Sequence, residues 1–365
     1  MNRLARLCTE QGQSPWLDTR PYLRDGVLEA MVADGIRGVT ANPTIFARAI
    51  EASNAYDDQF ATLTSAGSTV EDAYWDLVVC DVLHAATVLR PIYDDSGGTD
   101  GNVSIEVAPE LAYDTDATIA AARRLHERIA RPNVFVKIPA TTEGIPAITA
   151  MIAEGVGINI TLIFSLPRYQ QVIEAYLQGL ETFTAHGGAP AHVHSVASFF
   201  VSRVDTEVDH RLEHLGTADP LALRGRAAIA QAQLAYQIFR DSFTGPRWDN
   251  LAAHGAHPQK PLWASTSTKN PAYPDTKYVD GLIGPDTINT LTETTIAAFQ
   301  DHGTLTRNLD TAAAAATLMR ELAAVGVDMD DVGHTLEAEG VASFHTSFAD
   351  VLTALHTKTR QLERR

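Results

Sequence analysis

A lysine near the end of an apolar segment is the first residue of this sequence that could do chemistry. The segment reads NVFVKIPATTEG, and Lys137 is its only lysine. In a β-strand alternate residues share a face, so Lys137 would lie beside Phe135 while Val134, Val136 and Ile138 point the other way. An inward amine at a strand end suggests a nucleophile that forms a Schiff base with a carbonyl substrate. A lysine that reaches the rim or pairs with a carboxylate is the alternative.

Three other polar residues sit at comparable places in apolar segments and could serve this chemistry. At pH 7 only about one lysine in a few thousand is neutral, and burial favours the neutral amine that attacks a carbonyl. Loss of water from the first adduct needs proton transfer, for which Glu106 and Thr161 are candidates acting through a water. Carbon–carbon cleavage needs a base for the neighbouring hydroxyl, and Asp18 is the candidate.

The elements that must position these residues alternate between short apolar runs and amphipathic helices. The candidate strands cover residues 14–18, 38–42, 102–107, 133–138, 158–164, 192–198, 260–265 and 286–290. Asp116 is expected to cap one intervening helix, and Pro167 to begin another. Eight such units predict an α/β fold, a closed (β/α)8 TIM barrel with its active site at the carboxyl ends of the strands. An open doubly wound sheet is the alternative.

We expect a single domain over residues 1–365, because no linker divides the chain. Additional helices are expected at about 205–245, between the sixth and seventh strands. A helical C-terminal extension is expected at about 307–365, where LDTAAAAATLMRELAAVG has strong helix propensity.

Composition narrows the class of function. The 365 residues carry a formal net charge of −17, which argues against nucleic acid or an anionic membrane as the main partner. Two cysteines, Cys8 and Cys80, make no disulfide framework, and no apolar run approaches a membrane span. We expect a soluble cytoplasmic protein.

A series of motifs resembles the transaldolase family. In chain order they are SPWLDT, GVTANPTIF, VSIEVAPELAYDT, NVFVKIPAT, INITLIFS, VASFFVSRVD, WASTSTKNP and DTINT. The resemblance extends from about residue 12 to 300. It implies a class I aldolase barrel with neither metal nor organic cofactor, and sugar phosphates as substrates. Such enzymes move a dihydroxyacetone unit from sedoheptulose 7-phosphate or fructose 6-phosphate to glyceraldehyde 3-phosphate or erythrose 4-phosphate, in the pentose phosphate pathway. A homodimer is the usual assembly of the family.

The resemblance also implies roles for individual residues. Lys137 resembles the Schiff-base lysine, Glu106 and Thr161 the pair that holds the catalytic water, and Asp18 the acid/base for the C4 hydroxyl. The substrate contacts that it implies are Asn42, Asn159, Ser198, Phe200, Arg203, Ser265 and Lys269, of which Arg203 and Lys269 bind phosphate.

Two positions near the phosphate depart from the common pattern. Many relatives have arginine where this chain has Lys269, which binds phosphate as a point charge without a bidentate fork. Ser267 stands where close relatives often have glycine. These changes affect the preferred acceptor more than the reaction, so a transaldolase with a non-standard acceptor is one alternative. A fructose-6-phosphate aldolase is another, and a non-catalytic sugar-phosphate-binding barrel is a third.

Several other signals favour ordinary structural roles. His210 and His214 have zinc-like spacing, but a solvated helix face is the expectation, and His192 and His194 are expected on one face of a strand start, away from the catalytic rim. DMDDVG at 328–333 indicates a turn and helix cap rather than a calcium loop. Cys80 is expected in the core. Arg203 could instead pair with Asp205 or Glu207.

Overall fold

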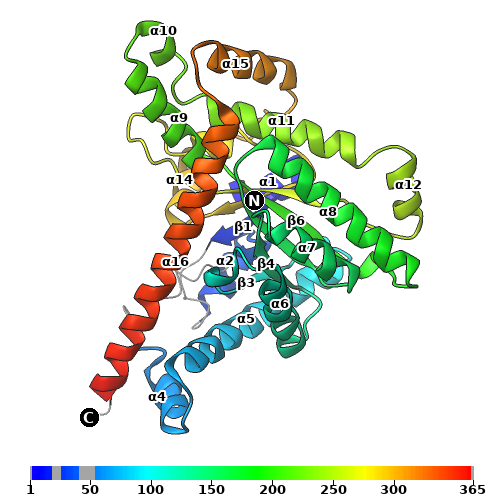
Figure 1. The fold of residues 1–365 in the computed structure, drawn as a ribbon, viewed down its shortest axis with the longest axis vertical. Coiled ribbons are helices and arrows are strands. Elements are labelled where there is room, and N and C mark those ends of the chain that lie inside the picture. The colour runs from blue at the N-terminus through cyan, green and yellow to red at the C-terminus, as the bar shows by residue number, and fades with distance from the viewer. Residues whose placement is uncertain (1, 19–25, 41–53, 363–365) are drawn as a thin grey trace.

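Eight parallel strands close into a barrel. The computed structural model describes residues 2–18, 26–40 and 54–362, so Asn42 lies outside the described residues. The strands are β1 (Gln13–Asp18), β2 (Gly38–Thr40), β3 (Val103–Glu106), β4 (Val134–Pro139), β5 (Ile158–Ile163), β6 (Ser195–Phe200), β7 (Lys260–Ala264) and β8 (Thr287–Leu291). Each pairs with its sequence neighbour, and β8 pairs with β1 (Figure 1). The predicted (β/α)8 barrel is confirmed, and the open sheet is excluded.

One strand boundary was predicted too early. Residues 190–192 form a 3-10 turn, η2 (Pro190–His192), and β6 begins only at Ser195. Proline fixes its own φ near −65° and has no N–H for the ladder, which suits a turn better than a central strand. His192 and His194 therefore precede the strand instead of alternating along it.

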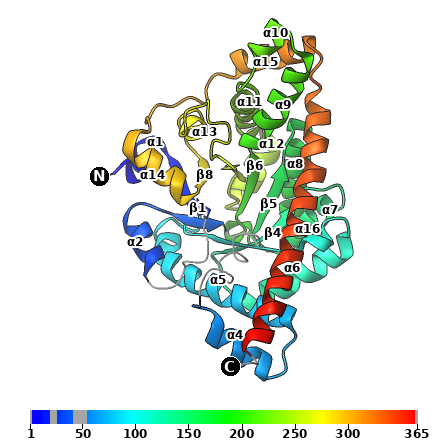
Figure 2. The same cartoon turned by 90° about the vertical axis from the view of Figure 1, so that its left-hand side faces the viewer.

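Helices surround the barrel (Figures 1 and 2). Before β6 they are α1 (Arg3–Gln11), α2 (Val27–Ala33), α4 (Asp57–Ser65), α5 (Val70–Asp95), η1 (Pro109–Leu111), α6 (Thr115–Ile129), α7 (Gly144–Ala153) and α8 (Leu166–Ala185). After β6 they are α9 (Ser202–Leu215), α10 (Ala218–Leu221), α11 (Ala227–Ser242), α12 (Pro246–Ala253), α13 (Lys277–Asp280), α14 (Glu293–His302), α15 (Ala312–Ala324) and α16 (Met329–Leu362).

The cap of α6 differs from the prediction. Asp114, not Asp116, occupies the cap position, and its side chain accepts a hydrogen bond from Ala117 N at 2.9 Å. Asp116 lies inside the first turn, where a carboxylate still interacts favourably with the helix dipole. At α8 the cap is Ser165, so the helix begins one residue before the expected Pro167.

The last helix, α16, crosses much of the molecule. It contacts α9 near its beginning, then β5 and η1, and finally α4 and α5 (Figures 1 and 2). Gly340 permits its close approach to β5, because a Cβ there would lie 3.0 Å from Leu162 Cδ2. The middle of α16 is thereby brought to the carboxyl end of β5, and the last turns of the helix lie beside α4.

The prediction that Cys80 belongs to the core is wrong. Its side chain is exposed, whereas the neighbouring Asp81 is 3% exposed and accepts a hydrogen bond from Tyr56 Oη at 2.6 Å. The sequence around Cys80 reads LVVCDVL, so apolar residues do not mark one face of the helix. The inward face of α5 at this point carries Asp81, which is buried with a hydrogen-bond partner, and Cys80 lies outside that face.

Candidate active site

Lys137 lies on β4 and points into the barrel. Its register partner on β3 is Glu106, and Nζ donates a hydrogen bond to Glu106 Oε2 at 2.9 Å. The two side chains are only 7% and 5% exposed. Val134, Val136 and Ile138 are buried in the apolar core, as the alternation predicted. The strand-end lysine is thus an inward, buried amine with a carboxylate beside it.

A cavity of about 190 Å³ opens at this end of the barrel. The predicted site residues that line it are Asp18, Lys137, Thr161, Ser198, Phe200, Arg203, Ser265 and Lys269. They lie near or directly after the carboxyl ends of five strands, β1, β4, β5, β6 and β7. The closed barrel therefore brings together in one cavity residues that lie far apart in the sequence.

Glu106 and Asn159 do not line this cavity, but each forms a hydrogen bond with a residue that does: Glu106 with Lys137, and Asn159 with Ser198. Asn159 is fully buried, donates to Ser104 Oγ at 2.9 Å and accepts from Ser198 Oγ at 2.7 Å. The amide nitrogen and oxygen of Asn159 are therefore oriented by residues on β3 and β6. Because the Ser198 hydroxyl donates its proton to Asn159, its oxygen remains as an acceptor at the cavity wall.

Thr161 has a buried hydroxyl without a hydrogen-bond partner among the described residues. An unpaired buried polar group costs about 1–3 kcal/mol, so such groups are rare unless a ligand or water uses them. In this cavity the hydroxyl is available to a reacting molecule.

The carboxyl ends of β1, β2 and β8 bring a further set of hydroxyl groups to Asp18. Thr40 Oγ1 lies 3.5 Å from Asp18 Oδ1 and 2.7 Å from Thr290 Oγ1. Both threonines line the cavity. The sequence reasoning did not single them out, although GVTAN and DTINT each placed a threonine near a strand end.

Two non-glycine residues beside the cavity have left-handed backbone conformations. Leu162 has φ 59° within an irregularity of the β5–β6 pairing, and Ser265 has φ 57° directly after β7. Such conformations cost on the order of 1–3 kcal/mol and cluster at functional sites. Leu162 follows Thr161, so the strain adjoins a residue of the cavity wall.

Arg203 enters the cavity from the first turn of α9. Its guanidinium lies 5.6 Å from the ring centre of Phe200, and Phe200 packs against Phe164 with ring centres 5.0 Å apart. Partial burial lowers the pKa of Arg203, although Glu339 opposes this. A partly desolvated arginine beside a helix N-terminus is a strong site for an anion.

The alternative that Arg203 pairs with Asp205 or Glu207 is wrong. Asp205 instead binds Lys277 Nζ at 3.1 Å, and Glu207 binds Arg211 at 2.7 Å. Among the described residues no ion pair engages Arg203, so its charge faces the cavity.

Lys269 reaches the cavity from the loop between β7 and α13. Its side chain is exposed, and hydrogen bonds of other loop residues fix the loop. Ser267 Oγ lies 2.7 Å from Thr295 Oγ1, and Tyr273 Oη donates to Asp209 Oδ2 at 2.6 Å. The loop is thus anchored on both sides of Lys269.

A further cavity residue, from the C-terminal helix, was also missed. Phe344 lies on α16, lines the cavity, and its ring centre is 5.7 Å from Lys137 Nζ. Nothing local in its sequence distinguishes it from the other buried aromatic residues of α16. Only the path of the helix places it above the amine.

Burial sets the acidity of the two carboxyl groups near Lys137. Loss of solvation raises the pKa of Glu106, and the positive charge of Lys137 opposes the rise. Loss of solvation likewise raises the pKa of Asp18, against the charges of Lys137 and Lys269. Burial therefore favours the protonated form of both carboxyl groups more than solvent does.

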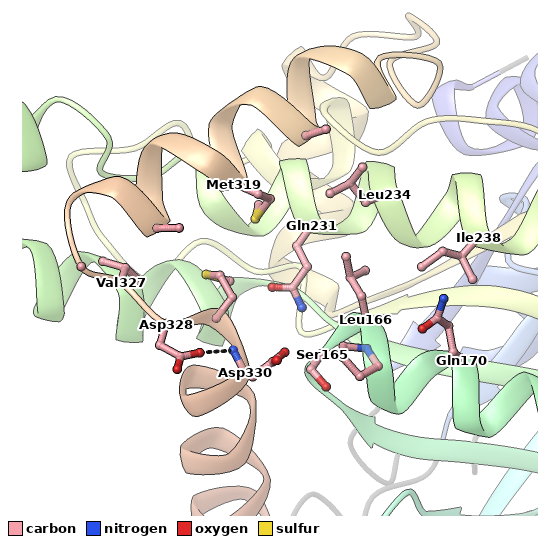
Figure 3. A pocket seen from close by; sticks show the side chains of 15 residues that line it. Ser165, Leu166, Gln170, Gln231, Leu234, Ile238, Met319, Val327, Asp328 and Asp330 are labelled. Atoms are coloured by element: carbon pink, nitrogen blue, oxygen red, sulfur yellow. Dashed lines mark hydrogen bonds between the residues drawn. The ribbon is translucent and has the colours of Figure 1, made fainter.

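A larger cavity, of about 790 Å³, lies away from this cluster (Figure 3). It is bounded by α8, α11, α15 and the start of α16, with Leu166, Leu234 and Met319 among its lining residues. Ser165 and Asp330 supply polar groups at one side, but no lysine, arginine or histidine of the described residues lines it. Size alone therefore does not identify the site; the chemistry lies in the smaller cavity.

The remaining signals have structural explanations. His210 and His214 meet edge-on on an exposed face of α9, as expected. Asp328 accepts hydrogen bonds from Asp330 N and Asp331 N, so DMDDVG is the helix cap that was predicted. His194 stacks on His257 at the amino ends of the strands, away from the catalytic rim. Within the described parts of the chain, no group of three potential ligands could hold a metal ion.

Known proteins resemble this chain over almost its whole length. The family model described as Transaldolase/Fructose-6-phosphate aldolase matches residues 16–355. Transaldolase 1 of Streptomyces avermitilis is 49% identical over 99% of this chain and 96% of its own length. The transaldolases of Acidothermus cellulolyticus (49% identical, 97% of this chain, 95% of its own) and Thermobifida fusca (48%, 94% and 95%) are similarly close. Together with the lysine, carboxylates and cations of the barrel cavity, these matches show that the chain belongs to the transaldolase/fructose-6-phosphate aldolase family.

Proposed function

We propose that this protein is a transaldolase that carries a dihydroxyacetone unit on Lys137. It takes the unit from a ketose phosphate, sedoheptulose 7-phosphate or fructose 6-phosphate, and gives it to an aldose phosphate, glyceraldehyde 3-phosphate or erythrose 4-phosphate. The observation that carries the proposal is the buried Lys137–Glu106 pair, 2.9 Å apart, at the wall of a polar cavity. The relatives named transaldolase support the same reaction.

The pair explains how the amine becomes a nucleophile. A proton moved from Lys137 Nζ to Glu106 leaves a neutral amine, and the raised pKa of the Glu106 carboxyl favours that transfer. The amine adds to the ketose carbonyl carbon. The resulting hydroxyl then leaves as water when Glu106 returns the proton, with Thr161 orienting the water.

Asp18 is the proposed base for the carbon–carbon cleavage. It removes the proton from the C4 hydroxyl, the C3–C4 bond breaks, and the electron pair stays on the three-carbon unit as an enamine. The aldose product then leaves. In the second half the enamine carbon attacks the acceptor aldehyde, and Asp18 returns the proton to the new hydroxyl. Thr40, 3.5 Å away, helps to orient the carboxylate.

The substrate contacts are proposed on the same basis. Asn159, Ser198 and Ser265, with Asn42 from outside the described residues, would bind the sugar hydroxyl groups. Arg203 and Lys269 would bind the phosphate, with Phe200 beside it. Their positions on the cavity wall, at the beginning of α9 and in the anchored loop, suit an anion.

The family description also covers fructose-6-phosphate aldolases, which is the main alternative. The two reactions share the Schiff base and differ in the fate of the enamine. A non-catalytic sugar-phosphate-binding barrel would need no nucleophile, so the buried Lys137–Glu106 pair disfavours it.

We further propose that the chain is a single domain, cytoplasmic and homodimeric. One continuous apolar core around the closed barrel supports the single domain. No described helix is long and apolar enough to cross a membrane. The homodimer follows from the family resemblance, and light scattering after gel filtration tests it.

Trapping with borohydride tests the central proposal. The protein is incubated with fructose 6-phosphate and sodium borohydride, and its intact mass is measured. We expect a three-carbon adduct on the wild type, none on Lys137→Ala, and an undiminished adduct on Lys260→Ala, which removes a lysine at the opposite end of the barrel. No adduct on the folded wild type would overturn the Schiff-base mechanism. Sedoheptulose 7-phosphate formed on adding erythrose 4-phosphate distinguishes transfer from simple cleavage.

A further inference from the structure

We propose that Phe344 of α16 controls whether the three-carbon unit on Lys137 is transferred or lost to water. The inference rests on the proposed function and adds to it a residue from the C-terminal helix. Phe344 is 7% exposed, lines the cavity that contains Lys137, and has its ring centre 5.7 Å from Nζ. No other residue of α16 lines that cavity within the described part of the chain.

The position of Phe344 follows from how α16 lies on the barrel. Gly333 and Gly340 remove side chains at two close approaches, where a Cβ would lie 2.8 Å from Ser165 Cβ and 3.0 Å from Leu162 Cδ2. Glycine within a helix costs about 1 kcal/mol relative to alanine, so a close approach is the usual reason for it. Four residues after Gly340, and thus on the same face, comes Phe344.

The helix is also held beyond Phe344. One turn further, Phe348 packs edge-on against Tyr74 with ring centres 5.4 Å apart, and it lies 6.2 Å from Trp75. Phe348 is 2% exposed and does not line the cavity. The helix therefore carries two neighbouring aromatic residues, one over the amine and one that only fastens the helix.

A ring over Lys137 matters because the enamine formed there can react in two ways. After the aldose leaves, the enamine carbon has two possible partners. Attack on an acceptor aldehyde forms a carbon–carbon bond and continues the transfer. Protonation of the same carbon by water instead gives an iminium ion; water then adds to C2, the C–N bond breaks, and dihydroxyacetone and the free amine result. An apolar ring over the amine restricts the access of bulk water and so favours transfer.

The test is the partition between the two outcomes. Fructose 6-phosphate and erythrose 4-phosphate are supplied, and free dihydroxyacetone and sedoheptulose 7-phosphate are measured in the same samples. For Phe344→Ala we expect the ratio of dihydroxyacetone to sedoheptulose 7-phosphate to rise about tenfold. Phe344→Leu, which keeps an apolar side chain, should give an intermediate ratio.

Phe348→Ala is the matched control. It removes the same atoms from the same helix one turn away, so it reports what loosening α16 does by itself. We expect its ratio to stay close to that of the wild type. If Phe348→Ala raises the ratio as much as Phe344→Ala, or if Phe344→Ala leaves it unchanged, the proposal is wrong.

Borohydride trapping separates this failure from a failure of the proposed function. An adduct on wild type and on Phe344→Ala with equal partition ratios would overturn only the role of Phe344. Should Phe344→Ala not fold, as judged by circular dichroism, the comparison of Phe344→Leu with wild type decides: an unchanged ratio overturns the proposal, and an increased one supports it.

Discussion

Buried or partly buried ionisable groups lie at both ends of the barrel, but these groups have different hydrogen-bond partners. At the amino ends of the strands Asp100 accepts hydrogen bonds from Ser14 Oγ at 2.7 Å, Trp16 Nε1 at 3.0 Å and Gly101 N at 3.1 Å. At the carboxyl ends Lys137 and Glu106 have each other, while Thr161 has no protein partner among the described residues. The Asp100 carboxylate is thus fully used by protein donors, whereas the Thr161 hydroxyl is left available to a substrate.

The cavities at the two ends differ in the ionisable groups that lie at them. The one at the amino ends, about 250 Å³, is lined by His194, His257 and Lys260. Burial lowers the pKa of His194 to about 4, so this histidine is neutral at physiological pH. At the carboxyl ends burial raises the pKa values of Asp18 and Glu106. Burial raises the pKa of Asp100 at the amino ends as well, so a shifted carboxyl group does not by itself mark a site; the amine of Lys137 beside Glu106 at the cavity wall does.

The largest expected effect is at the catalytic end. Glu106→Gln keeps the size of the side chain but cannot carry the proton, so kcat should fall by about 10²- to 10⁴-fold. Steady-state kinetics of sedoheptulose 7-phosphate formation measures this. Asp100→Asn is the matched control at the other end, and its kcat should stay near that of the wild type. Equal losses in both variants would remove the distinction between the two ends.

The second prediction concerns pH and the amino-terminal end. The pKa of His194 is about 4 in the fold and 6.5 in the unfolded chain, so its neutral form is favoured by folding. Its contribution to stability is complete above pH 6.5 and is lost as the pH falls toward 4, at a cost of about 3 kcal/mol. Urea unfolding at both pH values measures the change, which His194→Gln should reduce. His210→Gln, on an exposed helix face, should leave the pH dependence as it is.

The third prediction separates stability from activity. Asp100→Ala leaves the Ser14 hydroxyl without its acceptor and Trp16 Nε1 with only Ser14 Oγ at 3.1 Å. This should lower the free energy of unfolding by about 1–3 kcal/mol. Its kcat/KM per folded molecule should be unchanged, because the strands still carry the catalytic end. Urea unfolding together with kinetics on the same preparation checks both. A loss of kcat with intact stability would contradict the assignment of Asp100 to structure.

The smallest effect is expected at the proposed phosphate site. Lys269→Ala removes an exposed cation, so KM for fructose 6-phosphate should rise about tenfold while kcat changes little. Lys269→Arg should restore or improve binding, because arginine can contact two phosphate oxygens. Comparison of the two variants in one kinetic series tests whether the lysine acts as a point charge. A fall in kcat without a change in KM would place Lys269 in the chemical step instead.

Much of the barrel and of its cavity could be predicted from local pattern. Alternation along β4 predicted that Lys137 faces the barrel interior and that Val134, Val136 and Ile138 face the helices. In the structure Lys137 lines the cavity, and the three apolar residues are buried in the core. The boundaries of helices and strands were less predictable. Asp114 rather than Asp116 caps α6, and β6 begins later than predicted because η2 precedes it. Adjacent carboxylates compete for one cap, and only the backbone conformation at the helix start decides between them.

The sequence by itself determined the order of the elements and the residues that meet inside the barrel, because the period-2 alternation of a strand fixes which side chains face the same way. The tertiary structure alone decided what covers that interior. Phe344 reaches Lys137 because α16 passes over β5 at Gly340, and Asp205 does not pair with Arg203 because Lys277, far away in the sequence, binds it. These contacts join residues distant in sequence, so their geometry depends on packing between elements rather than on any local periodicity.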